Sequence, residues 1–199
     1  MIVLDHEQGT EEWFAARLGK PSASMFSKLI TTTGKPSSSA DGYINQLMAE
    51  IITGHSEGHF SNAHTERGNL LEPDARDMYE FISGNEVLEV GFILDDSLGF
   101  GCSPDGLVGT DGGLELKCPA GNTQVAYLRD PTVGVKKYWQ QLQGCMMVTG
   151  REWWDFMTYH PEMPHVLVRV ERDEEYIAKL AAELSKAVNV IKTELEKLA

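Results

Sequence analysis

The sequence is poor in cysteine and lacks long apolar runs, and each shortage excludes a class of protein. Three cysteines in 199 residues, none in a Cys-x-x-Cys pair, exclude a disulfide framework and a four-cysteine iron–sulfur cluster. No apolar run approaches the ~20 residues that a membrane-spanning helix needs. The acidic N-terminus also lacks the basic and apolar regions of a signal peptide. We therefore expect a cytoplasmic protein with no membrane contact.

Basic side chains are also scarce. The chain has 17 lysines and arginines against 30 acidic residues, which gives a net charge of −13. A polyanionic partner would therefore have to be held by a local basic patch or through a metal ion, because the overall field repels it. The length, with 42% hydrophobic and 24% charged residues, is typical of one globular domain over residues 1–199.

The periodicity of apolar residues predicts a mixed α/β fold, with a sheet flanked by helices. Pro73 is expected in the first turn of its helix, because an interior proline would break it, and Asp173 is the expected N-cap of the last helix. The predicted helices are 5–30 (broken at 19–21), 43–52, 66–83, 135–149 and 173–198. The predicted strands are 86–94, 99–103, 106–110, 113–119, 152–160 and 165–172.

Two short segments carry the chemistry, Ser-Pro-Asp-Gly and, seven residues later, Gly-Leu-Glu-Leu-Lys-Cys-Pro. Side chains alternate along a strand, so Glu115 and Lys117 point to the same face, about 7 Å apart. Leu114 and Leu116 then point to the other face, into a core. An acid and a lysine on one face of a buried strand suit a metal-dependent hydrolytic site.

The acid of the first segment, Asp105, completes this arrangement. A hairpin that turns at residues 111–112 would place Asp105 opposite Lys117, so that two carboxylates and one ammonium share a face. Carboxylate oxygens suit Mg²⁺ or Mn²⁺. The alternative is a solvated surface ion pair, which would contribute at most ~1 kcal/mol.

The segment Ser-Pro-Asp-Gly-Leu-Val-Gly-Thr-Asp-Gly-Gly-Leu-Glu-Leu-Lys-Cys-Pro resembles the active-site signature of the phage lambda-type exonucleases, the YqaJ-like viral recombinase family of the PD-(D/E)XK nuclease superfamily. Three further segments resemble motifs of that family in the same order: residues 13–24, the Arg-Gly-x-x-x-Glu helix at 67–72, and the Gln-x-Gln helix at 141–143. The resemblance spans about residues 13–160. It implies a restriction-endonuclease-like core, with a mixed central sheet flanked by helices.

The resemblance also implies roles for individual residues. Lys117 would be the catalytic lysine, and Gln141 would position the attacking water or the lysine. Two metal ions per active site would be held by Glu72, Asp105, Glu115 and the main-chain carbonyl of Leu116. A pocket for the terminal 5′-phosphate would contain Arg17, Ser24 and Ser103, since a guanidinium grips a phosphate with two hydrogen bonds and hydroxyls add donors.

Several of these residues also have ordinary structural interpretations. Glu72 could be a first-turn helix acid favoured by the dipole. Arg17 could stack on Trp13, four residues earlier. Ser24 could be a helix cap, and Gln141 could be a solvated helix residue.

The resemblance implies a Mg²⁺-dependent 5′→3′ exonuclease (Mn²⁺ being a possible substitute) that acts on 5′-phosphorylated ends of double-stranded DNA. It would release 5′-mononucleotides and leave a 3′ overhang for a single-strand annealing protein. A homotrimeric ring around DNA, and a phage or bacterial cytoplasmic setting, are further implications. The alternatives are an endonuclease or repair nuclease of the same superfamily, and a non-catalytic DNA-binding module.

Three other features favour structural roles. A zinc site at His55, His59 and His64 is not expected, because glycines interrupt the segment and no cysteine or aspartate completes the ligand set. Residues 153–154, two tryptophans, predict one core ring and one exposed ring. The C-terminal helix at 173–198 is expected to pack against the core or a second subunit.

Overall fold

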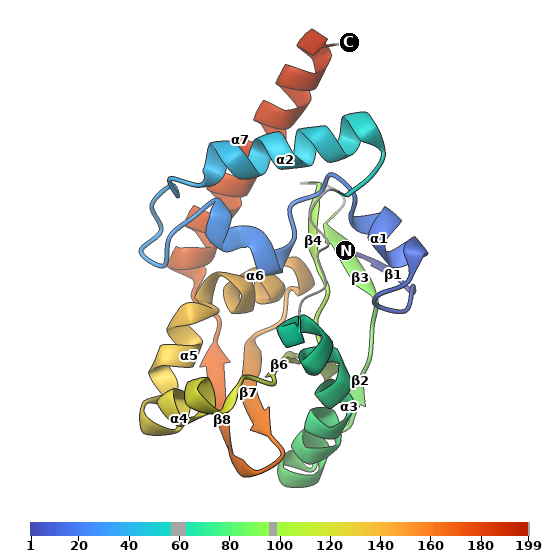
Figure 1. Ribbon diagram of the computed structural model, residues 1–199. Helices are drawn as coiled ribbons and strands as arrows, with labels where there is room; N and C mark the ends of the chain where they lie inside the picture. The colour runs from blue at the N-terminus through green and yellow to red at the C-terminus, as the bar shows by residue number, and fades with distance from the viewer. Residues whose placement is uncertain (57–62, 96–98, 199) are drawn as a thin grey trace.

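A computed structural model describes residues 1–56, 63–95 and 99–198 (Figure 1). It has the expected mixed α/β class. The strands are β1 (Ile2–Leu4), β2 (Val87–Leu88), β3 (Phe92–Asp95), β4 (Phe100–Cys102), β5 (Gly106–Val108), β6 (Gly112–Lys117), β7 (Trp153–His160) and β8 (Met163–Glu171). The helices are α1 (Glu11–Arg17), the 3₁₀ helix η1 (Ala23–Lys28), α2 (Ala40–Thr53), α3 (Ala63–Ser83), α4 (Gly121–Arg129), α5 (Pro131–Lys137), α6 (Trp139–Thr149) and α7 (Glu174–Leu198).

A five-stranded mixed sheet with the order β2-β5-β6-β7-β8 forms the centre of the fold. Only the β6–β7 pair is parallel, and the other pairs are antiparallel. The chain leaves β6, forms the three helices α4, α5 and α6, and returns to the sheet as β7, so this parallel pair has the helical crossover that it requires. β6 is therefore an interior strand, with a neighbour on each side.

Side chains from β6 divide between the two sides of the sheet, as the alternation predicts. Leu114 and Leu116 pack with Ala75 and Tyr79 of α3 and with Met157 of β7. A larger core contains side chains of η1, α2, α6 and α7. The strand that carries the acid and the lysine thus has one apolar face against α3, and this expectation is confirmed.

The predicted strand 86–94 is wrong, because two strands of different sheets lie there. β2 pairs with β5, whereas β3 lies between β1 and β4 in a separate three-stranded sheet. Gly91 separates them, and any side chain on it would collide with the carbonyl oxygens of Leu4 and His6. The close contact of Gly91 with the N-terminal segment explains why the apolar run 86–94 forms two strands and not one. The N-terminal strand β1 itself was not predicted.

The predicted hairpin register is also wrong by two residues. Val108 pairs with Gly112, so the turn comprises 109–111, and Asp105 extends toward the level of Glu115 and not Lys117. Gly109 has a φ of 55°, a conformation that favours glycine. Gly112 and Gly113 belong to the strand, because the rings of the tryptophans at 153–154 lie against their Cα atoms.

The helices differ from the predictions mainly at their ends. α3 begins at Ala63, so Pro73 lies inside the helix and not in its first turn. Residues 5–30 form two short helices, and the predicted helix 135–149 is interrupted at Tyr138. α4 and most of α5 have no counterpart in the prediction. In α7, by contrast, the side chain of Asp173 accepts the predicted capping hydrogen bond, from Tyr176 N.

The apolar stripe of α7 packs against the rest of the fold over most of its length, and its last turns extend beyond it (Figure 1). Among the helices that the structure describes, none combines the length and the apolar character needed to cross a bilayer.

Candidate active site

The interior strand β6 brings the acid and the lysine of the second segment together. The Glu115 side chain is completely buried. Its Oε1 atom accepts hydrogen bonds from Lys117 Nζ and, at 2.7 Å, from Gln141 Nε2 of α6. The ammonium of Lys117 also lies 5.1 Å from the ring centre of Tyr138. Gln141 is therefore a partner of the buried acid, and the interpretation of it as a solvated helix residue is wrong.

Asp105 lies just before β5 and joins the same group of charges. Its Oδ2 atom accepts a 2.6 Å hydrogen bond from the main-chain N–H of Leu116. This bond fixes the aspartate against β6, between the positions of Glu115 and Lys117 in the sequence. The structure thus brings both carboxylates and the ammonium together, although through a different register from the predicted one. The main-chain group of Leu116 that contacts Asp105 is its N–H, whereas the group expected to bind a metal is its carbonyl.

Glu72 approaches this group from α3. Its Oε1 atom lies 2.8 Å from Nη2 of Arg76, one helical turn later, and Nη1 of Arg76 lies 3.0 Å from Glu89. Glu72 is the tenth residue of α3, so it is not a first-turn acid stabilised by the helix dipole. Pro73, the next residue, has no N–H to donate to the carbonyl of Asn69.

The acids of this group have raised pKa values. The pKa of Glu115 is raised to about 8 and that of Glu72 to about 6, in both cases mainly by burial and then by the charge of Asp105. Burial also raises the pKa of Asp105. Burial alone would lower the pKa of Lys117, but the charges of Glu115 and Asp105 raise it above its usual range. Burial is thus the main cause for all three acids, and the repulsion from Asp105 adds to it for Glu72 and Glu115.

The donor set fits a hard divalent cation. Oε2 of Glu115 is buried and accepts no hydrogen bond from any described residue, although a buried carboxylate oxygen is costly without a partner. Carboxylate oxygens are ligands of Mg²⁺, which usually takes one or two of them together with water and phosphate oxygens. Within residues 1–56, 63–95 and 99–198, no group of three or more acidic, histidine or cysteine side chains is arranged so that it could hold a metal ion. The acids are instead bonded to Lys117, Arg76 and the Leu116 amide.

The residues predicted to bind the 5′-phosphate are connected to one another through Trp13 and Ser22. The guanidinium of Arg17 lies 3.9 Å from the centre of the Trp13 ring, so the predicted stacking is confirmed. Trp13 Nε1 donates to Ser103 Oγ at 3.0 Å. Arg17 Nη2 donates to Ser22 Oγ, which lies 3.3 Å from Ser24 Oγ.

Ser22, and not Ser24, precedes η1, so the structure does not support a capping role for Ser24. The hydroxyls and the guanidinium therefore form one connected polar group. Through Trp13, this group reaches Ser103, which lies two residues before Asp105 in the sequence.

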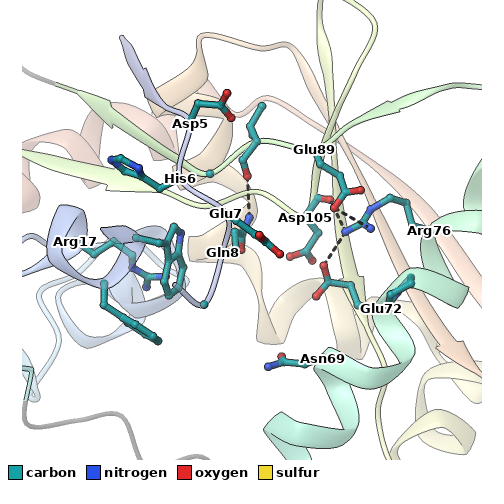
Figure 2. A pocket seen from close by; sticks show the side chains of 16 residues that line it. Asp5, His6, Glu7, Gln8, Arg17, Asn69, Glu72, Arg76, Glu89 and Asp105 are labelled. Atoms are coloured by element: carbon teal, nitrogen blue, oxygen red, sulfur yellow. Dashed lines mark hydrogen bonds and ion pairs between the residues drawn. The ribbon is translucent and has the colours of Figure 1, made fainter. Parts of the chain in front are cut away.

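A cavity of about 760 Å³ is lined by Glu72, Arg76 and Asp105 of the acidic group and by Trp13 and Arg17 of the polar group. Its size is within the range of ligand sites. Figure 2 shows Arg17 at one side and Glu72, Arg76, Glu89 and Asp105 grouped at the other. The N-terminal residues 5–9 form part of the wall. Among these, Gln8 Nε2 donates to the carbonyls of Val90 and Pro104.

Sequence reasoning missed four contributors to this site: Gln8, Ser22, Arg76 and Tyr138. Arg76 could have been found, because it follows Glu72 by four residues in a predicted helix and an acid–base pair at that spacing meets on one face. The contact of Gln8 with Pro104 joins residues 96 positions apart, and no local pattern reports it.

The remaining candidates have structural roles or lie outside the description. Trp154 is fully buried, and Trp153 lies under the guanidinium of Arg169, which is 3.5 Å from its ring centre. His55 is exposed, while His59 and the side chain of His64 lie outside the described residues.

Three comparisons relate the chain to known proteins. The model of the YqaJ-like viral recombinase domain matches residues 12–152. Two crystal structures of LHK-Exo, an alkaline exonuclease from Laribacter hongkongensis, are 39% and 38% identical to this chain, with TM-scores of 0.84 and 0.86. Each covers 95% of this chain and 96% of its own, and the first contains dAMP. A search of curated protein sequences gives no match.

A more distant structure agrees in fold alone. A phage-related exonuclease from Haemophilus somnus 129PT is 16% identical, with a TM-score of 0.76 over 90% of this chain and 96% of its own. These likenesses confirm the expected restriction-endonuclease-like core, with its mixed central sheet flanked by helices.

Proposed function

Because the chain belongs to the YqaJ-like viral recombinase domain family, we propose that it is a Mg²⁺-dependent 5′→3′ exonuclease acting on double-stranded DNA ends. The observation that carries the proposal is the buried group of Asp105, Glu115 and Lys117 beside a cavity that contains Arg17. LHK-Exo is an alkaline exonuclease and its structure with dAMP holds a deoxynucleoside monophosphate, which supports 5′-mononucleotides as the product here.

The metal ions, two in our proposal, would be held by Glu72, Asp105, Glu115 and the Leu116 carbonyl. When bound, Mg²⁺ polarises a phosphoryl oxygen and lowers the pKa of a water molecule. Oε2 of Glu115, which is buried without a hydrogen-bond partner among the described residues, supports this assignment. Mn²⁺ has the same preference for oxygen ligands and could substitute.

The side chains have separate tasks in this proposal. In the metal-free site the charges of Glu115 and Asp105 raise the pKa of Lys117, and in our proposal the task of its ammonium is to neutralise charge that develops on the phosphate. Gln141 holds the carboxylate of Glu115 in one orientation through their 2.7 Å hydrogen bond. Attack by water on the phosphodiester then releases one nucleotide.

Arg17, with Ser24 and Ser103, would hold the terminal 5′-phosphate. Stacking on Trp13 fixes the plane of the guanidinium, and a planar guanidinium binds phosphate with two hydrogen bonds. A pocket for a terminal phosphate favours an exonuclease over an endonuclease or repair nuclease, since an internal cut offers no terminal group. A non-catalytic DNA-binding module would have no use for an unpartnered buried carboxylate oxygen.

Two assembly properties belong to the same proposal. A homotrimeric ring would keep the enzyme on DNA despite the net charge of −13. Exposed apolar side chains at Leu70, Phe81 and Leu88 supply surface for subunit contacts. The 3′ overhang would be passed to a single-strand annealing protein, in the cytoplasm of a bacterial host.

One gel assay tests the proposal. Linear duplexes with 5′-phosphate or 5′-hydroxyl ends, and covalently closed circles, are incubated with wild type and with Lys117→Ala, with and without Mg²⁺. We expect Mg²⁺-dependent loss of the linear 5′-phosphorylated duplex by wild type only. Cleavage of closed circles would support an endonuclease instead, and equal degradation by both proteins would contradict the proposal.

A further inference from the structure

Arg67 of α3 connects the helix that carries Glu72 to the strand that carries Glu115 and Lys117. Its Nη1 atom donates to the carbonyl of Cys118 at 2.9 Å and to the carbonyl of Pro119 at 3.0 Å. These are the two carbonyls that directly follow Lys117, where β6 ends. A charged donor shared by two consecutive carbonyls holds the main chain more firmly than a neutral hydrogen bond would.

The position of this clamp matters because β6 loses its sheet partners there. Lys117 pairs with Thr158 of β7, and this is the last pair of the β6–β7 ladder. The residue after Cys118 is a proline, which has no N–H to donate to a neighbouring strand. The main chain beyond Lys117 is therefore held to α3 by a side chain, whereas the strand itself is held by the sheet.

We propose that Arg67 is a positioning residue for the nuclease reaction: it fixes the end of β6 against α3 and so sets Lys117 and Glu115 relative to Glu72. This inference rests on the proposed function, since it assigns Arg67 a task in that same site. Arg67 contacts none of the three side chains and acts through the main chain. A displacement of about 1 Å between groups that act together can reduce a rate by ~100-fold.

The molecule contains a matched control at the other end of the same hairpin. Nη1 of Arg151 donates to the carbonyls of Val108, Gly109 and Gly112, at 3.2, 3.0 and 2.6 Å. Arg151 therefore clamps main-chain carbonyls of β5 and β6 as Arg67 does, but at the turn and not at the site. A purely structural role predicts the same consequences for the loss of either arginine.

The experiment compares Arg67→Met, Arg67→Lys and Arg151→Met with wild type. We expect Arg67→Met to lower kcat by 30-fold or more, by the displacement argument, with KM and the salt dependence of DNA binding unchanged. Arg67→Lys, which retains a charged donor, should recover part of the loss. Arg151→Met should lower the melting temperature by at least as much as Arg67→Met while leaving kcat close to that of wild type.

A second measurement does not depend on activity. Calorimetric titration with Mn²⁺ should show weaker binding to Arg67→Met, by about tenfold for a misaligned ligand, and unchanged binding to Arg151→Met. Equal losses of kcat in the two methionine variants would overturn the inference. So would a raised KM with a reduced salt dependence, which would mean that Arg67 contacts DNA directly. If wild type degrades no DNA, the proposed function fails, and the Mn²⁺ titration alone then decides whether Arg67 aligns the acids.

Discussion

Glu115 and Asp155 are buried carboxylates on the paired strands β6 and β7, and their charges are met in different ways. Asp155 has a partner for each oxygen: Oδ2 accepts from Tyr79 Oη and from Arg169 Nη2, both at 2.8 Å, and Oδ1 accepts from Arg169 Nε at 2.9 Å. Glu115 has both of its donors on Oε1, and its Oε2 has none among the described residues.

The comparison shows that burial of an acid does not by itself indicate a catalytic site. Three hydrogen bonds from Tyr79 and Arg169 satisfy Asp155, so its burial can be explained by stability alone. Around Glu115, the neighbouring charge of Asp105 adds to the burial and raises the pKa to about 8. Glu115 shares a single ammonium, that of Lys117, with Asp105, so a further cation would stabilise this site.

The largest effect should come from removing the cation that Glu115 does have. Lys117→Ala should reduce the nuclease rate by about 10²–10³-fold, the usual result of removing one group that stabilises transition-state charge. Single-turnover cleavage of a 5′-phosphorylated duplex measures the chemical step. Asp155→Asn is the control, and it should retain most of the activity per folded molecule. Comparable losses in both variants would remove the distinction between the two acids.

Stability should show the opposite order. Asp155→Ala leaves Tyr79 and Arg169 without their acceptor, and we expect a loss of about 2–3 kcal/mol, below the value for a fully buried pair because the Arg169 side chain is 46% exposed. Because the raised pKa of Glu115 keeps the carboxyl protonated in the metal-free fold near neutral pH, Glu115→Gln replaces one neutral group by another and should leave the free energy of unfolding unchanged or higher. Urea denaturation without divalent ions measures both. A Glu115→Gln variant less stable than Asp155→Ala would contradict the comparison.

Part of this site could be predicted because strand alternation is a local property. The side-chain period of two was enough to place Glu115 and Lys117 on one face and the flanking leucines on the other. The register of the hairpin was not local. Gly112 resembles a turn residue in the sequence, and it belongs to β6 because the ring of Trp153, 41 positions later, leaves no room for a side chain.

For the residues of the predicted phosphate pocket, too, local contacts could be predicted from the sequence and long-range contacts could not. Stacking of Arg17 on Trp13 follows from their spacing of four on one helix, and the sequence offered it as the structural alternative to a phosphate contact. The hydrogen bond from Trp13 to Ser103 joins residues 90 positions apart, and only the fold brings them together.

Metal binding should separate the two acids by stability as well as by activity. A saturating divalent ion, at about 100 times its dissociation constant, adds ~2.7 kcal/mol to the stability of the state that binds it. We expect Mn²⁺ to raise the melting temperature of wild type and of Asp155→Asn, and to leave Glu115→Gln close to its metal-free value. Thermal denaturation with Mn²⁺ or EDTA measures this. An equal rise in all three proteins would place the ion elsewhere.

The pH dependence of stability should also separate the two acids, by its direction. The pKa of Glu115 is raised from 4.5 to about 8 by burial and by Asp105, so between these values the folded state keeps a proton that the unfolded chain releases. The free energy of unfolding should therefore fall as the pH rises through this window when no metal is present. Each 1 kcal/mol corresponds to about 2–4 °C for a chain of this size. Glu115→Gln should lose this decrease, and Asp155→Asn should keep it. Identical pH profiles for wild type and Glu115→Gln would show that the charge of Glu115 is already compensated in the metal-free fold.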